Sequence, residues 1–135
     1  MATDTDTFAR FVDLVASSLD DHAAASGEPA ARMHVSRSQL DRAVSAAAGE
    51  TPGGFGRRIR LERAAYRLVT GDVGVLDVAL EAGYSSNEAF TRAFRRAYGV
   101  SPSAWRVEPR AVQLAAPNGV HFHPPAVSGC RPEQR

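Results

Sequence analysis

Residues 74–102, with the sequence GVLDVALEAGYSSNEAFTRAFRRAYGVSP, contain two amphipathic patterns separated by a very short break. In the first pattern, over residues 75–82, apolar side chains recur with helical period and predict a buried face of Leu76, Ala79 and Leu80, with Val78 and Ala82 beside them. The break is Gly83-Tyr84, where glycine can adopt the positive φ that a sharp helix exit needs. We therefore expect a helix that ends at Gly83 and is followed at once by a second one.

The second pattern begins at Ser85-Ser86-Asn87-Glu88, which has the Ser-x-x-Glu spacing of a capping box and predicts a helix to about Tyr98. Its expected apolar face is Phe90, Ala93, Phe94 and Ala97. The opposite face offers polar and charged groups at Asn87, Glu88, Thr91, Arg92 and Arg95. A helix, a tight glycine turn and a second helix with such an outer face predict a helix-turn-helix, whose second helix enters the major groove of DNA.

The run LDVALEAGYSS, followed by FTRAFRR and GVSP, closely resembles the second helix-turn-helix of AraC/XylS-type transcription regulators. The resemblance covers roughly residues 8–107. It implies an all-α, seven-helix domain in which two helix-turn-helix subdomains are joined by a long connector helix.

A first helix-turn-helix is expected near residues 29–48. Ser36-Arg37-Ser38-Gln39 is a second capping-box pattern, and the helix that follows should continue to about Ala48. Its inward face is expected to be Leu40, Ala43, Val44 and Ala47, and its outward face Ser38, Asp41, Arg42 and Ser45. His34 occupies the turn position, and histidine is among the residues that tolerate positive φ. The run VSRSQLDR again resembles the family.

Four further helices are expected around these motifs. A scaffold helix over 7–21 has an apolar stripe of Phe8, Phe11, Val12, Val15 and Leu19. A short helix over 29–34 starts the first motif, the connector spans 52–70, and a last short helix runs from Pro102 to about Arg106. Glycines at 53, 54 and 56 are expected to fray the start of the connector.

The chain divides into a domain over residues 7–107 and a Pro-rich tail over 108–135. The tail has no apolar periodicity, so we expect it to be disordered, mobile and dispensable. Its run LAAPNGVHFHPP resembles a segment of some family members that continue into a further domain. A DNA-binding fragment of a longer regulator is therefore one alternative interpretation of the chain.

The resemblance also implies which residues face DNA. Arginine can bond guanine and asparagine can bond adenine in the major groove, while other polar groups position the helix on phosphates. Base-facing positions are expected at Ser38, Asp41, Arg42, Asn87, Glu88, Thr91 and Arg92. Phosphate contacts are expected at Ser36, Arg37, Ser85, Ser86, Arg95 and Arg96. The two recognition helices would then enter successive major grooves.

Charge is unevenly distributed along the chain, although the net charge is only +1. Residues 1–28 contain six acidic residues and one arginine, whereas residues 29–110 contain 13 arginines and eight acidic residues. A basic central segment suits a polyanionic partner. Of the connector arginines at 57, 58, 60, 63 and 67, we expect about half to line a solvated face with Glu62 and the rest to attract DNA.

Other classes of function find little support. No apolar run approaches the ~20 residues of a membrane span, and no secretory signal pattern is present. The single cysteine, Cys130, fits a reducing compartment, so a cytoplasmic location is expected. His121-x-His123 with Cys130 could begin a metal site, but structural zinc requires four ligands. We expect no metal, no cofactor and no catalytic site.

The sequence therefore predicts a transcription regulator that binds specific double-stranded DNA at promoters, contacts RNA polymerase, and is monomeric. A helical protein-interaction module with solvated arginines is the alternative from another class.

Overall fold

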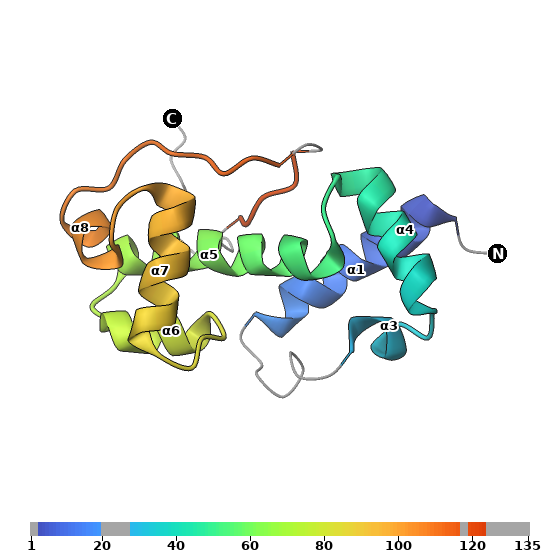
Figure 1. The fold of residues 1–135 in the computed structure, drawn as a ribbon, viewed down its shortest axis with the longest axis horizontal. Helices are drawn as coiled ribbons and strands as arrows, with labels where there is room; N and C mark the ends of the chain where they lie inside the picture. The colour runs from blue at the N-terminus through green and yellow to red at the C-terminus, as the bar shows by residue number, and fades with distance from the viewer. Residues whose placement is uncertain (1–2, 20–27, 117–118, 124–135) are drawn as a thin grey trace, which may run out of the picture.

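The computed structural model describes residues 3–19, 28–116 and 119–123. Within these ranges the regular elements are all helices: α1 (Asp4–Ser18), α3 (Pro29–Arg32), α4 (Arg37–Ala48), α5 (Pro52–Thr70), α6 (Val75–Glu81), α7 (Asn87–Tyr98) and α8 (Pro102–Val107). The long α5 runs through the middle, with α1, α3 and α4 at its first end and α6, α7 and α8 at its second (Figure 1). The predicted all-α architecture, with two helical subdomains joined by a connector, is confirmed.

The first subdomain is built on an aromatic contact between α1 and α5. The Phe55 ring lies 5.7 Å from Phe8 and 5.5 Å from Phe11, centroid to centroid. Around these rings pack Leu40 and Val44 of α4, both almost fully buried. Fully burying one such side chain contributes about 1.5–3 kcal/mol, so these few contacts hold α4 against α1. We call this cluster the first core.

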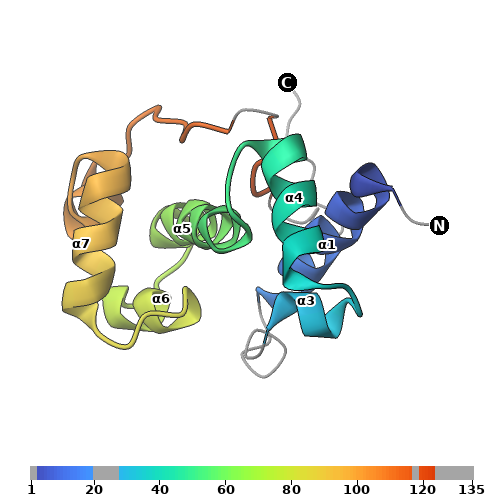
Figure 2. The ribbon, with the colours of Figure 1, turned by 45° about the vertical axis from the view of Figure 1, so that its right-hand side comes forward.

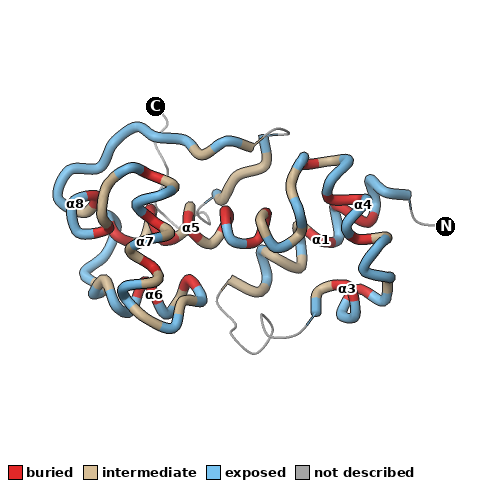
Figure 3. The backbone as a smooth tube through the Cα atoms, in the orientation of Figure 1, coloured by how far each residue is buried: buried red, intermediate tan, exposed pale blue. Residues whose placement is uncertain are grey.

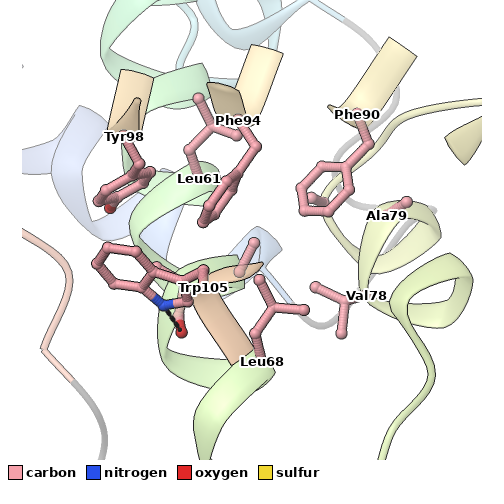
Figure 4. Close-up of a cluster of buried hydrophobic side chains, with 11 residues drawn as sticks. Leu61, Leu68, Val78, Ala79, Phe90, Phe94, Tyr98 and Trp105 are labelled. Atoms are coloured by element: carbon pink, nitrogen blue, oxygen red, sulfur yellow. Dashed lines mark hydrogen bonds between the residues drawn. The ribbon is translucent and has the colours of Figure 1, made fainter. Parts of the chain in front are cut away.

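The second subdomain has its own core, built from α5, α6, α7 and α8 (Figure 4). Phe94 stacks on Tyr98 at 4.6 Å and meets the edge of Trp105 at 5.8 Å. The indole Nε1–H of Trp105 donates to the carbonyl of Ala65 at 3.0 Å, which satisfies the polar atom of a buried ring and fixes α8 to α5. Buried residues occur along both ends of α5, which contributes to both cores (Figure 3).

The connector α5 has the predicted bounds, and its three early glycines lie within the helix. The Thr51 hydroxyl accepts a hydrogen bond from the Gly54 N–H at 2.9 Å, and Pro52 fills the first turn, where its missing N–H costs nothing. Gly56 is buried close to the side chain of Arg60. A Cβ added to this glycine would lie only 3.2 Å from Nη1 of Arg60. The cap and the packing of Phe55 offset the low helix propensity of the glycines.

Helix α1 begins earlier than predicted, at Asp4 in place of Thr7. Thr3 and Asp6 form a capping box, with the Thr3 hydroxyl accepting from the Asp6 N–H at 3.0 Å and the Asp6 carboxylate accepting from the Thr3 N–H at 3.3 Å. The sequence interpretation followed the apolar stripe and missed this polar start signal. The predicted end near residue 21 lies outside the described residues.

The predicted buried face of α6 is right for Ala79 and its neighbours but wrong for its two leucines. Leu76 and Leu80 are 53% and 45% exposed, and the buried residues are Val78, Ala79 and Ala82. Helix α6 packs against α5 and α7, and its small buried residues join the second core. That geometry rotates the larger leucines toward solvent.

Part of the tail expected to be mobile packs against the helices. We define the C-terminal segment as residues 108–116 and 119–123; it passes above α7 and returns to the middle of α5 (Figure 1). Phe122 lies 5.8 Å from the Tyr66 ring, and its backbone N–H donates to Glu62 at 2.7 Å. Val120 packs against the first core, and Leu114 packs against the second. Isolated apolar residues in an irregular segment make no periodic pattern, which is why this packing was not expected.

Candidate nucleic-acid interface

Both recognition helices are preceded by the same kind of turn. In the second motif Gly83 has φ of +91°, its N–H donates to Leu80, and the Tyr84 N–H reaches back to the carbonyl of Ala79 at 3.0 Å. In the first motif His34 has φ of +61°, its N–H donates to Ala31, and the Val35 N–H reaches back to Ala30 at 3.0 Å. This pair of bonds around a left-handed residue is a Schellman motif.

The predicted positive φ at His34 is therefore confirmed. The two turns have the same hydrogen bonds, so α4 and α7 follow their preceding helices through the same backbone geometry. The turn residue is His34 in the first motif and Gly83 in the second.

Helix α4 presents its predicted polar face to solvent. Its N-cap is Ser36, whose hydroxyl accepts from the Gln39 N–H at 3.0 Å. The predicted contact residues Ser36, Arg37, Ser38, Asp41 and Arg42 are all exposed. On the inward side Leu40, Ala43, Val44 and Ala48 are buried, while Ala47, predicted to point inward, is half-buried. Arg37 also lies 3.7 Å from Glu28, an exposed pair of little energetic weight.

Helix α7 presents the second polar face but starts one residue later than predicted. Ser86 is the N-cap, because its hydroxyl accepts from the Ala89 N–H at 3.1 Å, so the predicted capping box of Ser85 with Glu88 is wrong. Two adjacent serines made the register ambiguous in the sequence. Among the predicted contact residues, Ser86 and Thr91 are half-buried, and the exposed ones are Ser85, Asn87, Glu88, Arg92, Arg95 and Arg96.

The two helices lie on either side of α5 and are roughly parallel to each other (Figure 2). On α7 the inward face is aromatic, with Phe90, Phe94 and Tyr98 buried. All thirteen residues predicted to meet bases and phosphates are thus exposed or half-buried. Their individual roles remain predictions.

Several connector arginines serve the structure rather than an outer basic face. Arg58 is only 7% exposed and bonds both carboxylate oxygens of Glu50, at 2.8 and 3.0 Å, and Glu62 at 3.0 Å. Burial opposes its charge, but the hydrogen bonds and charges of the two glutamates outweigh that effect and raise the pKa of Arg58. Arg67 pairs with Glu81 of α6 at 3.0 Å, and Arg63 donates to the Leu19 carbonyl.

Arg60 lies against the turn of the second motif. It is half-buried, and a Cβ built on Gly83 would lie 3.6 Å from its Nε. Burial lowers the pKa of Arg60, with neighbouring Arg57 acting in the same direction, and burial raises the pKa of Tyr84. Arg57 is the exposed member of the connector set. The sequence showed the run of arginines. It gave no sign of which arginines would pair with a glutamate distant along the chain.

The histidines of the tail do not form a metal cluster in the described residues. His121 Nδ1 lies 2.8 Å from Glu62, and no group of three or more His, Cys, Asp or Glu side chains in the described part of the chain could hold an ion. Cys130 lies outside the described residues.

A family model described as a helix-turn-helix domain matches residues 30–108, more than half of the 135-residue chain. The chain belongs to the AraC-type helix-turn-helix family. The match begins within α3 and ends after α8, so it includes both Schellman turns and both recognition helices of this AraC-type domain.

Two similar curated proteins are transcriptional regulators by name. The chain is 40% identical over 78 residues to the HTH-type transcriptional regulator MtrA of Neisseria gonorrhoeae, which covers 58% of this chain and 26% of that protein. It is 37% identical over 93 residues to the HTH-type transcriptional regulator CdhR of Pseudomonas aeruginosa, covering 68% of this chain and 28% of that protein. The chain thus matches about a quarter of the length of these relatives.

Solved structures share the AraC-type fold. The DNA-binding domain of AdpA, a global transcriptional factor solved in complex with a target DNA, is 32% identical with a TM-score of 0.61, covering 75% of this chain and 93% of that one. The C-terminal domain of AraT, a response regulator from Geobacillus stearothermophilus, has a TM-score of 0.70 at 22% identity, covering 90% of this chain and 98% of that one. Among the described residues of the present chain, no helix is long and apolar enough to cross a membrane.

Proposed function

We propose that this chain binds specific sequences in double-stranded DNA and regulates transcription at promoters. The observation that carries the proposal is the pair of exposed, N-capped helices, α4 and α7, each introduced by a Schellman turn on a shared connector. The AdpA domain, which has the same fold, was solved with its target DNA, and MtrA and CdhR are named as regulators.

In this proposal α4 and α7 enter successive major grooves on one face of the duplex, whose centres lie about 34 Å apart. Arg42 and Arg92 would supply guanidinium groups to base edges, with Asn87 as a candidate for adenine. Serine hydroxyls and arginines at the helix starts and on the outer flank of α7 would position the helices on phosphates.

The test is a titration of the full chain with fluorescent promoter fragments at several salt concentrations. We expect saturable binding that selects one sequence over scrambled DNA and weakens steeply as salt rises, because arginine–phosphate contacts release counterions. Binding that ignores salt, or no selection among fragments of the flanking genomic DNA, would overturn the proposal.

Three finer expectations belong to the same proposal. We propose that the chain acts as a monomer, that it works in the cytoplasm where the chromosome is accessible, and that it contacts RNA polymerase. The chain could equally work as the DNA-binding part of a longer regulator, since it matches about a quarter of its relatives.

One observation favours a second role for the chain, in which it contacts another protein. Leu76 and Leu80 lie one turn apart on α6 and are both about half exposed. Substituting both with Gln should leave DNA affinity unchanged and reduce transcription in a reconstituted assay if this surface contacts polymerase. Unchanged transcription would dismiss this role for the leucine pair.

A further inference from the structure

Two arginines of the connector lie close together beside the turn of the second motif. Arg57 and Arg60 are one helical turn apart on α5, with Arg57 exposed and Arg60 half-buried. The Nε of Arg60 lies 3.6 Å from the position that a Cβ would take on Gly83, so the guanidinium of Arg60 lies against the turn that introduces α7. We call Arg57 and Arg60 the connector pair.

Glycines leave the space that both guanidinium groups occupy. Nη1 of Arg57 lies 3.5 Å from the Cβ position of Gly53, and Nη1 of Arg60 lies 3.2 Å from that of Gly56. A larger residue at position 56 would therefore press on the head of Arg60. The early glycines of α5 are each unfavourable in a helix by about 1 kcal/mol relative to alanine, and they keep room for two positive charges near the turn.

The charges of the connector pair act against each other. Within the described residues no carboxylate bonds either arginine, whereas the neighbouring Arg58 bonds two glutamates. Burial lowers the pKa of Arg60, and the charge of Arg57 acts in the same direction, although arginine stays charged at neutral pH. An anion that approaches both arginines attracts both charges and relieves this repulsion. The pair therefore favours an anionic partner from outside the described chain.

The connector pair lies on the face of α5 that the C-terminal segment does not use. Glu62 and Tyr66 contact that segment through Phe122. Because successive residues of an α-helix are about 100° apart, Arg57 and Arg60 point to the side of α5 opposite Glu62 and Tyr66. The pair thus faces away from the C-terminal segment and toward the turn of the second motif.

The surroundings of the pair match the expected course of DNA. Ser85, a predicted phosphate contact, directly follows the Gly83-Tyr84 turn against which Arg60 lies. Helix α5 lies between α4 and α7 (Figure 2). When these two helices occupy successive major grooves, the DNA backbone between the grooves passes the connector. Phosphates of that backbone are the anions nearest to the pair in such a complex.

We propose that Arg57 and Arg60 bind phosphates of the DNA backbone between the major grooves entered by α4 and α7. This inference rests on the proposed DNA-binding function and extends the interface from the recognition helices to the connector. The pair adds affinity and fixes the position of both recognition helices on one duplex. It reads no bases, because phosphate contacts carry no sequence information.

Titration of fluorescent duplexes over a range of salt concentrations tests the pair in full-length Arg57→Gln and Arg60→Gln chains. Each substitution should make the slope of log affinity against log salt shallower by about 0.9, because one phosphate contact fewer releases fewer counterions. The loss of affinity should be equal on a flanking promoter fragment and on its scrambled version. Arg110→Gln, which removes an exposed arginine of the C-terminal segment, is the charge-matched control and should keep the slope.

Lysine variants separate the charge of the pair from its packing. Arg57→Lys and Arg60→Lys keep a positive charge that can contact phosphate, so both should keep the salt slope of the unaltered chain. Equal losses in the lysine and glutamine chains would show a packing role only and would overturn the proposal. Should Arg60→Gln fail to fold by circular dichroism, the exposed position Arg57 still decides the outcome.

Two further results are distinguishable. A steep salt slope in the unaltered chain that persists in both glutamine chains would overturn this inference and leave the proposed function intact. An unaltered chain that binds no duplex, or binds it without dependence on salt, would overturn the proposed function and this inference together.

Neutral phosphates then locate the contact. On a duplex with methylphosphonate linkages between the two segments that footprinting shows to be protected, the unaltered chain should bind as weakly as the Arg57→Gln, Arg60→Gln double variant binds normal DNA. The double variant should lose little more on this duplex, because both changes remove the same contacts. An equal further loss in the double variant would show that the pair does not bind these phosphates.

Discussion

At the residue scale, one half-buried carboxylate joins the connector to the C-terminal segment. Glu62, in the middle of α5, accepts hydrogen bonds from Arg58 and from the Phe122 N–H, and lies beside His121. In the second core, the ring of Tyr98 is buried against Phe94 and Trp105. Burial, reinforced by the charge of Glu62, raises the pKa of Tyr98 well above its ordinary value.

This shift predicts a loss of stability in alkali. An unfolded-state tyrosine titrates near pH 10, whereas the folded state holds the proton of Tyr98 more tightly. The stabilisation is therefore complete below about pH 10 and is lost as pH rises beyond it. Tyr98→Phe should leave the free energy of unfolding at pH 7 within about 1 kcal/mol of the unaltered value and flatten the decline above pH 10.

Urea unfolding at pH 7, 9, 10 and 11 measures this effect. Tyr66→Phe, which removes the hydroxyl of a half-buried ring on the same connector, is the control and should keep the alkaline decline. A Tyr98→Phe protein that loses stability as steeply as the unaltered chain would contradict the assignment. Some decline should remain in either case, because burial also raises the pKa of Tyr84.

At the element scale, each recognition helix depends on its own cap and on the face it buries. The hydroxyls of Ser36 and Ser86 cap α4 and α7. The buried side of α7 is a chain of rings, with Phe90 5.6 Å from Phe94 and Phe94 4.6 Å from Tyr98. The buried side of α4 has smaller residues, including Ala43 and Ala48, and small side chains remove less apolar surface from water.

The cap assignment on α7 gives a paired prediction. Ser86→Ala removes the acceptor of the Ala89 N–H and should lower the free energy of unfolding by about 1 kcal/mol. Ser85→Ala changes an exposed serine outside the helix and should cost less than about 0.5 kcal/mol. Chemical denaturation of both variants compares them, and a larger loss for Ser85→Ala would restore the capping box expected from the sequence.

The difference between the buried faces of α4 and α7 predicts which recognition helix contributes more to DNA sequence specificity. Because α7 is held by large rings, we expect it to supply most of the sequence specificity. Arg92→Ala should weaken binding to the specific operator by about 1–3 kcal/mol and relax selection at one base pair. Arg42→Ala should cost less, since neighbouring Asp41 is repelled by phosphates and can draw Arg42 away from bases. Both are titrated on one operator at fixed salt, and a more damaging Arg42→Ala would reverse the ranking.

At the scale of the whole molecule, two small cores share one connector, and the C-terminal segment joins them a second time. Leu114 packs on the second core, and Val120 and Phe122 pack on the first. Each core alone is small, so contacts that span both should contribute measurably to stability. We therefore propose residues 7–107 as the DNA-binding domain and residues up to 123 as part of its folded unit.

Two truncated chains test whether residues up to 123 belong to the folded unit. A chain ending at Glu108 loses the Phe122 contacts with Tyr66 and Glu62 and should melt about 5–10 °C below the full chain. A chain ending at His123 keeps these contacts and should melt close to the full chain. Differential scanning calorimetry compares all three, and equal melting of the two truncated chains would show that the C-terminal segment is dispensable, as the sequence suggested.

The sequence by itself determined the features that depend on neighbours along the chain. Helical period placed α4, α5 and α7, and Gly83 and His34 marked the turns. Serine and threonine caps marked the starts of α4, α5, α7 and α8 to within a residue, whereas the Thr3 cap of α1 was missed. The tertiary structure decided which apolar arc of α6 is buried, because the second core covers Val78 and Ala79 and leaves Leu76 and Leu80 exposed. It also decided the partners of Glu62 in the C-terminal segment, since residues about 60 positions apart meet there and no local pattern encodes their distance.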